Sequence, residues 1–315
     1  MKYSFLAVVA VIIYLASASD GWCGGRKPSL TNPLLKTMAF KEIVPFRDKI
    51  DSYLEQKKAD GTITEAAFYF RSLADGIWSG IDEKRSFSGA SLLKIPMMLA
   101  YYKIAETDPK ILKKKIKYEI MMNETRNYVP VKSPEPGKYY TVDEMISIMI
   151  RLSDNNALIV LGSNLNEQYR SRVMDDLGLT NKDEPEQSGD NISIKQIVSL
   201  FRILYNSSYL NTKMSEKALK TMTDTDFRTG IVASLPPNIQ VSHKFGERSY
   251  LNTDIKELHE CAIVYYSKNP YLIGIMTRGK DFDQLTEVIK SVSKMVYDEI
   301  DYQYSYSYTG GVFEQ

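Results

Sequence analysis

The chain has 315 residues, of which 43% are hydrophobic and 25% charged, the composition of an ordinary globular protein with room for a sizeable core. Its 40 Lys and Arg side chains nearly cancel its 39 Asp and Glu side chains, so the charge gives no reason to expect a nucleic-acid partner. The two cysteines, Cys23 and Cys261, are too few for a disulfide framework or a metal-ligand cluster.

The N-terminus has the features of an export signal. Lys2 precedes the apolar run of residues 5–16, and Ala16-Ser17-Ala18 resembles a cleavage site. This pattern predicts that residues 1–19 form a secretory signal peptide, with a retained membrane anchor as the alternative. Residues 20–42 mix Gly, Pro and Ser with basic side chains and are interpreted as a linker. We therefore expect an exported protein, periplasmic or extracellular, that is either free or tethered to the membrane.

The first structural elements follow the linker. Residues 44–58 have the pattern of an amphipathic helix. Residues 63–73 and 76–83 read as two strands of a hairpin around Ala74-Asp75-Gly76. From about Ser88 to Met222 the pattern is mostly helical.

Strands return near the end of the chain. Residues 238–246 alternate in character, and two further strands are predicted at 260–267 and 271–277. A final helix carries an apolar stripe that ends at Ile300. Strands at both ends with helices between them predict an α+β fold: an antiparallel sheet from both chain ends, flanked by helices, with an inserted all-helical region. We expect this monomeric domain to span residues 43–302 and a disordered tail to occupy 303–315.

The residues 86–102 are almost all small or apolar, yet they include Lys94 three positions after Ser91. Gly89 and Ala90 suit a helix start, where backbone N–H groups and the helix dipole stabilise an anion near Ser91. The spacing puts both side chains on one helix face. Because the surrounding residues leave no polar face, we expect a buried helix whose desolvated lysine acts as a base toward the serine hydroxyl.

A second Ser-x-x-Lys, from Ser291 to Lys294, provides an internal contrast, since the motif alone is expected about once by chance in a chain of this length. Ser291 and Lys294 fall off the apolar stripe of the final helix, so we expect them on a solvated face. The apolar surroundings, more than the spacing, favour Ser91 and Lys94 as the reactive pair.

A polar triplet, Ser153-Asp154-Asn155, separates two apolar helices, the first of which opens with a capping box of Thr141 and Glu144. Alone, the triplet fits an ordinary helix–helix turn, because Ser, Asp and Asn are common caps. The functional alternative places the Ser153 hydroxyl between two amines as a proton relay and offers the Asn155 amide to a substrate carbonyl.

The late strand contains His243-Lys244-Phe245-Gly246. Gly246 would let a ligand backbone approach closely, and Lys244 would present a positive charge to a substrate carboxylate. Alone, this motif favours a solvent-facing lysine on a half-buried strand.

The three motifs in order resemble those of the penicillin-recognising serine hydrolases, most closely the class A β-lactamases and their transpeptidase-like relatives. The resemblance covers roughly residues 45–300. It implies an acyl-enzyme mechanism in which Ser91 attacks a β-lactam or acyl-D-Ala-D-Ala carbonyl and Lys94 is the base. No metal or cofactor is implied.

The resemblance also implies roles for other residues. The backbone N–H groups of Ser91 and Glu247 would form an oxyanion hole. Ser153 and Lys244 would pass a proton to the leaving nitrogen, and Tyr128 would line the cleft.

The sequence departs from the family pattern in two places. Class A β-lactamases carry a glutamate, in an E-x-x-L-N segment, that activates the deacylating water. Glu184 is the candidate here, but Gln187 and Ser188 stand where Leu and Asn are expected. Phe245 replaces a Thr or Ser whose hydroxyl helps hold the substrate carboxylate.

Three functions follow from these observations. The first is an exported class A-type β-lactamase. The second, favoured by the altered segment around Glu184, is a D-Ala-D-Ala carboxypeptidase or related peptidoglycan-acting acyl enzyme. The third, favoured by Phe245, is a non-catalytic cell-surface module. The expected partner is a β-lactam or a peptidoglycan stem peptide.

Overall fold

The computed structural model describes residues 43–120, 128–129, 133–180, 190–267 and 269–308. The predicted signal segment, the linker and Glu184 therefore lie outside the described residues. Among the helices of the described part, none is long and apolar enough to span a bilayer.

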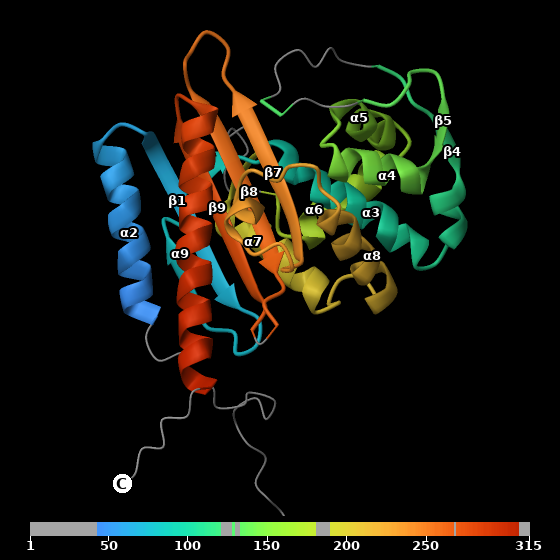
Figure 1. The fold of residues 1–315 in the computed structure, drawn as a ribbon. Coiled ribbons are helices and arrows are strands. Elements are labelled where there is room, and N and C mark those ends of the chain that lie inside the picture. The colour runs from blue at the N-terminus through green and yellow to red at the C-terminus, as the bar shows by residue number, and fades with distance from the viewer. Residues whose placement is uncertain (1–42, 121–127, 130–132, 181–189, 268, 309–315) are drawn as a thin grey trace, which may run out of the picture. The chain divides into compact units, whose positions relative to one another are not determined.

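A five-stranded antiparallel sheet forms the centre of the domain (Figure 1). Its order is β2-β1-β9-β8-β7. The strands come from both ends of the chain, namely β1 (Ile63–Ser72), β2 (Trp78–Ile81), β7 (Val241–Ser249), β8 (Lys256–Val264) and β9 (Tyr271–Gly279). The register pairs the early β1 with the late β9, from Ile63 opposite Gly279 to Ser72 opposite Tyr271. The predicted α+β sheet built from both chain ends is confirmed.

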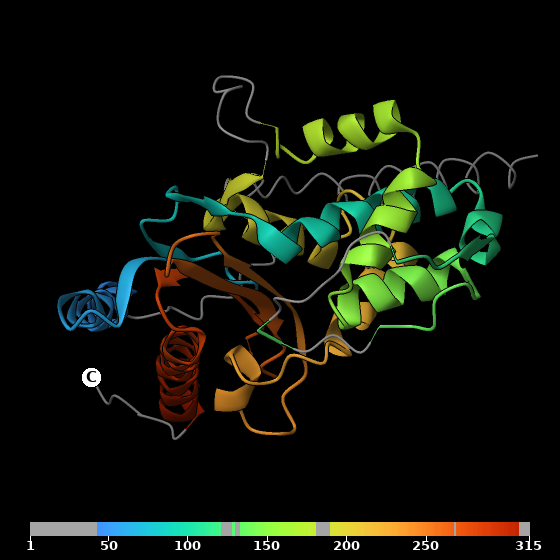
Figure 2. The same ribbon diagram turned by 90° about the horizontal axis from the view of Figure 1, so that it is seen from above.

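Helices cover both faces of this sheet, as the view from above shows (Figure 2). On one face lie α2 (Ile43–Ala59) and α9 (Phe282–Tyr308), and on the other lies α7 (Ile194–Tyr205). A Cβ on Gly274 of β9 would come within 2.7 Å of side-chain atoms of Ile194 and Val198. The missing side chain therefore lets α7 lie directly on the sheet.

The remaining elements form the inserted helical region beside the sheet (Figure 1). Its helices are α3 (Lys94–Ala105), α4 (Val142–Arg151), α5 (Asn155–Ser163), α6 (Glu167–Asp176) and α8 (Thr212–Thr223). Two small antiparallel pairs connect this region, β3 (Ser86–Ser88) with β6 (Asn191–Ser193) and β4 (Lys115–Lys117) with β5 (Tyr139–Thr141). Short 3₁₀ helices occur at Ala90–Leu93 (η1), Pro109–Lys113 (η2) and Ile231–Ser234 (η3).

Ser91 lies in the 3₁₀ helix η1, which is followed directly by α3. Ten of the twelve α3 residues are buried, which confirms the expected buried helix. Pro96 lies in the first turn of α3. Backbone N–H groups there have no partner within the helix, so a proline is tolerated at this point.

The end of α9 corrects one expectation. The tail was predicted to begin at residue 303, but α9 continues to Tyr308. The apolar stripe ends at Ile300, and the Tyr- and Ser-rich residues beyond it have no helical hydrophobic period. They extend an existing helix, which costs less than starting a new one because the first turn is the unfavourable step.

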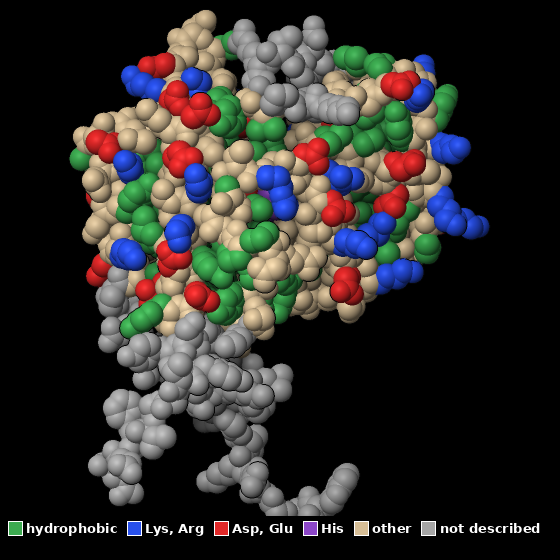
Figure 3. Space-filling model, viewed as in Figure 1, with side chains coloured by type: hydrophobic (Ala, Val, Ile, Leu, Met, Phe, Trp, Pro, Cys, Tyr) green, Lys and Arg blue, Asp and Glu red, His purple; other side chains and the backbone are tan. Residues whose placement is uncertain are grey.

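Charges of both signs are mixed on the face seen in Figure 3, over α2, α9 and the helical region. On the described part of this face, Lys and Arg side chains lie among Asp and Glu side chains and form no single-sign patch. Pairs such as Lys294 with Asp298, 2.8 Å apart on α9, are typical. Lys294, in the second Ser-x-x-Lys motif, is therefore on a solvated face, as predicted.

Candidate active site

Side chains from η1, α3, the α4–α5 turn and β7 meet around Lys94. The Lys94 ammonium nitrogen lies 2.6 Å from Ser91 Oγ. It also donates to the Ser153 carbonyl oxygen at 2.7 Å and to Asn155 Oδ1 at 2.5 Å. Lys94 is only 1% exposed. The structure thus brings the first two predicted motifs into hydrogen-bond contact at a buried lysine.

Ser153 links the two lysines. Its Oγ lies 3.3 Å from Lys94 Nζ and 2.9 Å from Lys244 Nζ. The backbone at Ser153 is left-handed, with φ of 59°, and Ala90, next to Ser91, has φ of 43°. Such conformations are costly for non-glycine residues and cluster at functional sites. At Ser153 this backbone presents both the carbonyl and the hydroxyl oxygen to Lys94.

Lys244 on β7 is fully buried. The alternative prediction of a solvent-facing lysine on a half-buried strand is therefore wrong. Its Nζ donates to Ser153 Oγ and, at 3.0 Å, to the Phe245 carbonyl. Burial, and next the nearby charge of Lys94, hold the pKa of Lys244 well below its usual value. The alternating sequence pattern predicted one solvent-exposed face on this strand. That prediction is wrong because α8 packs against β7 and residues Val241–Gly246 are buried on both faces.

Gly246 brings β7 close to the nucleophile. A Cβ at Gly246 would lie 3.2 Å from the Ser91 backbone nitrogen and 3.3 Å from the Gly89 carbonyl oxygen. The glycine therefore makes room for the η1 backbone. Because β7 is the edge strand of the sheet, some of its backbone groups have no strand partner and point away from β8. This is the arrangement that an oxyanion hole shared by η1 and β7 requires.

Asp154 has a positioning role that the sequence analysis did not assign. Its fully buried carboxylate caps α5 by accepting the Ala157 backbone N–H at 2.6 Å. It also accepts the hydroxyl groups of Tyr118, at 3.0 Å, and Ser133, at 2.9 Å. These contacts hold the turn that carries Ser153. The capping preference of Asp was visible in the sequence, but its two distant hydroxyl donors were not.

Phe245 is part of the core, and its ring also lies beside Lys244. Its ring stacks on Phe227 with centroids 4.3 Å apart, and its side chain is buried. Lys244 Nζ lies 4.4 Å from the Phe245 ring centroid. An aromatic ring thus stands where the family resemblance predicts a hydroxyl.

Glu247 and Tyr128 contact each other, although the prediction gave them separate roles. The Glu247 carboxylate accepts the backbone N–H of Tyr128 at 2.9 Å and of Val129 at 3.3 Å. Burial raises the pKa of Glu247 to about 7. The predicted role of Glu247 involved only its backbone N–H group, so these side-chain contacts were not expected.

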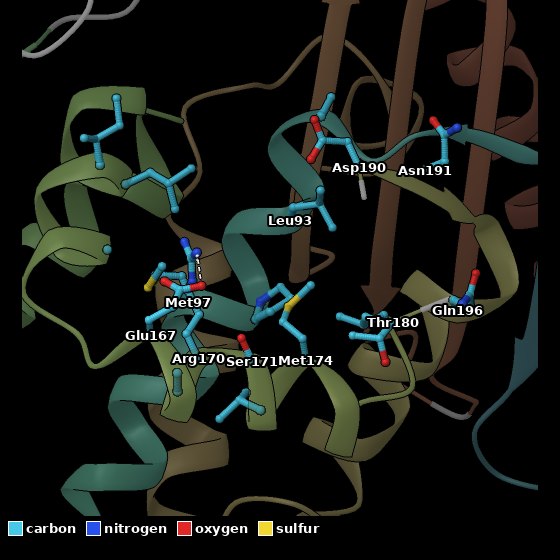
Figure 4. A pocket seen from close by; sticks show the side chains of 18 of the residues that line it. Leu93, Met97, Glu167, Arg170, Ser171, Met174, Thr180, Asp190, Asn191 and Gln196 are labelled. Carbon is cyan, nitrogen blue, oxygen red and sulfur yellow. Dashed lines mark hydrogen bonds and ion pairs between the residues drawn. The ribbon is translucent and has the colours of Figure 1, made fainter. Parts of the chain in front are cut away.

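A cavity of about 1290 Å³ lies beside η1 and α3 (Figure 4). Ala90 and Leu93 line it, together with residues of α5, α6 and the β6 region, whereas Ser91 and Lys94 do not. The Glu167–Arg170 ion pair of α6 lies at its edge. The cavity is thus separate from the Ser–Lys cluster. In the described part of the chain, no three His, Cys, Asp or Glu side chains are placed to hold a metal ion.

The sheet and helical region together form the β-lactamase/transpeptidase-like fold. A PBP-A mutant, solved as its acyl-enzyme complex with penicillin G, is 20% identical with a TM-score of 0.68, and the alignment covers 82% of this chain and 97% of that one. The β-lactamase from Burkholderia phymatum is also 20% identical, with a TM-score of 0.68 and coverage of 82% and 100%. The class A β-lactamase from Mycobacterium abscessus is 17% identical, with a TM-score of 0.68 and coverage of 81% and 99%.

Residues 45–300 match the model of the β-lactamase enzyme family. The match covers most of the chain, and the protein belongs to this family. Among curated proteins, no sequence matches it significantly.

Proposed function

We propose that this protein is an exported serine hydrolase that acts on β-lactams through an acyl-enzyme on Ser91. The observation that carries the proposal is the 2.6 Å contact between Lys94 Nζ and Ser91 Oγ in a buried site that Ser153 connects to Lys244. Family membership supports a hydrolase of this type, and PBP-A forms an acyl-enzyme with penicillin G in a similar fold.

The base in this proposal is neutral Lys94. A neutral amine has two N–H bonds and one lone pair. The N–H bonds fit the Ser153 carbonyl and Asn155 Oδ1, at 2.7 and 2.5 Å, and the lone pair faces the Ser91 hydroxyl. Lys94 then takes the Ser91 proton as the Oγ–carbonyl bond forms. The N–H groups of Ser91 and Glu247 receive the oxyanion.

Ser153 completes the acylation step. When the amide C–N bond breaks, the Ser153 hydroxyl gives its proton to the leaving nitrogen and recovers one from the adjacent lysine amines, 2.9 and 3.3 Å away. A depressed pKa of Lys244 suits this relay, because a weakly basic ammonium releases a proton readily. Water then cleaves the ester and releases the product acid. Glu184 remains the proposed base for this second step.

The second candidate is a D-Ala-D-Ala carboxypeptidase or related peptidoglycan-acting acyl enzyme. The altered segment around Glu184 favours it, because Gln187 and Ser188 stand where Leu and Asn are expected, and an acyl-enzyme without a deacylating base would persist. The same Ser91 and Lys94 chemistry would then act on an acyl-D-Ala-D-Ala amide.

Kinetics with a chromogenic cephalosporin and intact-mass spectrometry after exposure to penicillin G test these proposals. The β-lactamase proposal expects turnover that is lost in Ser91→Ala and kept in the matched control Ser291→Ala. A persistent penicillin adduct on Ser91 without turnover would favour the peptidoglycan enzyme. A chain that captures neither penicillin nor a fluorophosphonate probe at Ser91 would be a non-catalytic module.

A further inference from the structure

The Glu247 carboxylate joins two distant parts of the chain. Oε1 accepts the Tyr128 N–H and Oε2 accepts the Val129 N–H, across more than a hundred residues of sequence. Each carboxylate oxygen thus serves one backbone donor. This is the two-oxygen pattern that an ionised carboxylate offers and a neutral side chain does not.

Tyr128 is also attached to α9. Its hydroxyl donates to Asp283 Oδ1 at 2.6 Å, and its ring stacks on Phe282 with centroids 4.8 Å apart. The Thr286 hydroxyl donates to the Tyr128 hydroxyl oxygen at 3.3 Å. The backbone of Tyr128 and Val129 is therefore held by Glu247 on one side, while the Tyr128 side chain is held by α9.

These contacts lie at the nucleophile end of β7. Glu247 directly follows Gly246, where an added Cβ would lie 3.2 Å from the Ser91 backbone nitrogen. Figure 1 shows the short green piece that contains Tyr128 and Val129 beside the end of β7. The carboxylate thus fixes a second chain segment within one residue of the strand position that faces Ser91.

We propose that Glu247 is a positioning residue for acylation: its carboxylate fastens Tyr128 and Val129 to the end of β7, and loss of its charge releases them. The proposal rests on the proposed function, since the strand end that Glu247 fixes carries the oxyanion N–H. A protonated carboxyl group keeps one good acceptor oxygen and turns the other into a donor. The second backbone N–H then loses its partner.

The electrostatic surroundings place this change near neutral pH. Burial raises the pKa of Glu247 to about 7, against the lowering effects of the two backbone N–H groups and of Lys244 and Lys94. Tyr128 stays neutral over this range, because burial and its bond to Asp283 raise its pKa. Above about pH 7 the carboxylate is therefore ionised and accepts both backbone N–H groups, and below about pH 7 its protonated form keeps one good acceptor oxygen.

The first test measures the attachment itself, without substrate. Residue-resolved hydrogen exchange gives protection factors for the Tyr128 and Val129 amides at pH 6 and pH 8. We expect the wild-type protection to fall about tenfold at the lower pH, the size of a lost hydrogen bond to a charged group. Glu247→Gln, whose amide has one acceptor oxygen, should show the low value at both pH values. The control Glu287→Gln, an exposed change on α9, should behave as wild type.

The second test measures the consequence for Ser91. The second-order rate of acylation by penicillin G, followed by intact mass, should be lower in Glu247→Gln than in Glu287→Gln. The acylation rate of Glu287→Gln divided by that of Glu247→Gln should increase from pH 6 to pH 8. The deacylation rates of the two variants should stay equal. Val129→Pro, which removes one donor and keeps Glu247, should show a similar loss and keeps the test informative if Glu247→Gln folds poorly.

Unchanged amide protection in Glu247→Gln, or an acylation ratio independent of pH, would overturn the positioning role. A wild-type protein that switches its amide protection but never acylates would leave this attachment established and refute the proposed function. The two failures are therefore distinguishable.

Discussion

The Phe245 ring stacks on the Phe227 ring with centroids 4.3 Å apart and an interplanar angle of 24°. Both side chains are buried, so the residue between Lys244 and Gly246 belongs to the core that includes β7 and η3. The family resemblance predicts a Thr or Ser hydroxyl at this position, where it would help hold a substrate carboxylate. Here the ring packs in the core, and the position has no hydroxyl donor.

Phe245→Thr is predicted to lower the stability of the protein and to improve its binding of a substrate carboxylate. Loss of the aromatic stack should lower the free energy of unfolding by about 3 kcal/mol, the range of large-to-small core changes. The restored hydroxyl should speed acylation by penicillin G, because one more donor faces the carboxylate. Phe245→Val is the matched control, since valine has the shape of threonine without the hydroxyl. If the two variants acylate at the same rate, the carboxylate is not bound at this position.

Lys94→Met tests the base. Methionine fills a similar volume in the buried helix without an amine, so the variant should fold. We expect the acylation rate to fall by at least about a hundredfold, the usual contribution of a positioned base. Lys294→Met changes the lysine of the second Ser-x-x-Lys motif and should leave the rate unaltered. A Lys94→Met protein that acylates as fast as Lys294→Met would exclude the lysine as base.

The sequence predicted the fold and the Ser–Lys–Ser–Lys cluster well because each depends on local pattern and motif order. The apolar surroundings of Lys94 distinguished it from Lys294, and the structure bears this out at 1% and 61% side-chain exposure. The order of the family motifs predicted that Ser153 and Lys244 share a site, and their side chains are in hydrogen-bond contact.

The contacts that were missed are all long-range and made by side chains. The alternation of apolar and polar residues along β7 could not show that Lys244 is buried. Such a pattern reflects the two faces of one strand and does not reveal that α8 packs against it. The hydroxyl donors of Asp154 lie 36 and 21 residues away, and the donors to Glu247 lie more than a hundred residues away. Nothing in the local sequence marks such partners.

Asp154→Ala is predicted to damage both stability and acylation. The variant removes the α5 cap and the carboxylate that accepts the Tyr118 and Ser133 hydroxyl groups, so the free energy of unfolding should drop by about 2 kcal/mol. The turn that orients Ser153 should also loosen, which slows acylation. Tyr118→Phe removes one of these bonds and no charge, so its effect on both quantities should be smaller. Denaturant unfolding and penicillin acylation measure the two effects. An Asp154→Ala protein with wild-type acylation would show that the turn holds Ser153 unaided.

Glu247 should leave a signature in the pH dependence of global stability. Burial raises its pKa in the folded protein to about 7, from an ordinary value of 4.5, so the folded state favours the protonated carboxyl. This contribution to stability is full below about pH 4.5 and is lost as the pH rises through 7. Denaturant unfolding of wild type and Glu247→Gln at pH 5, 6, 7 and 8 should therefore show wild type losing stability relative to the variant up to about pH 7 and no further change above it. Over the same pH range the attachment of Tyr128 and Val129 should strengthen, because the ionised carboxylate accepts both N–H groups. Burial of the charge at the same time lowers the free energy of unfolding of the whole protein. A difference between the two proteins that does not vary with pH would mean that Glu247 has the same proton affinity folded and unfolded.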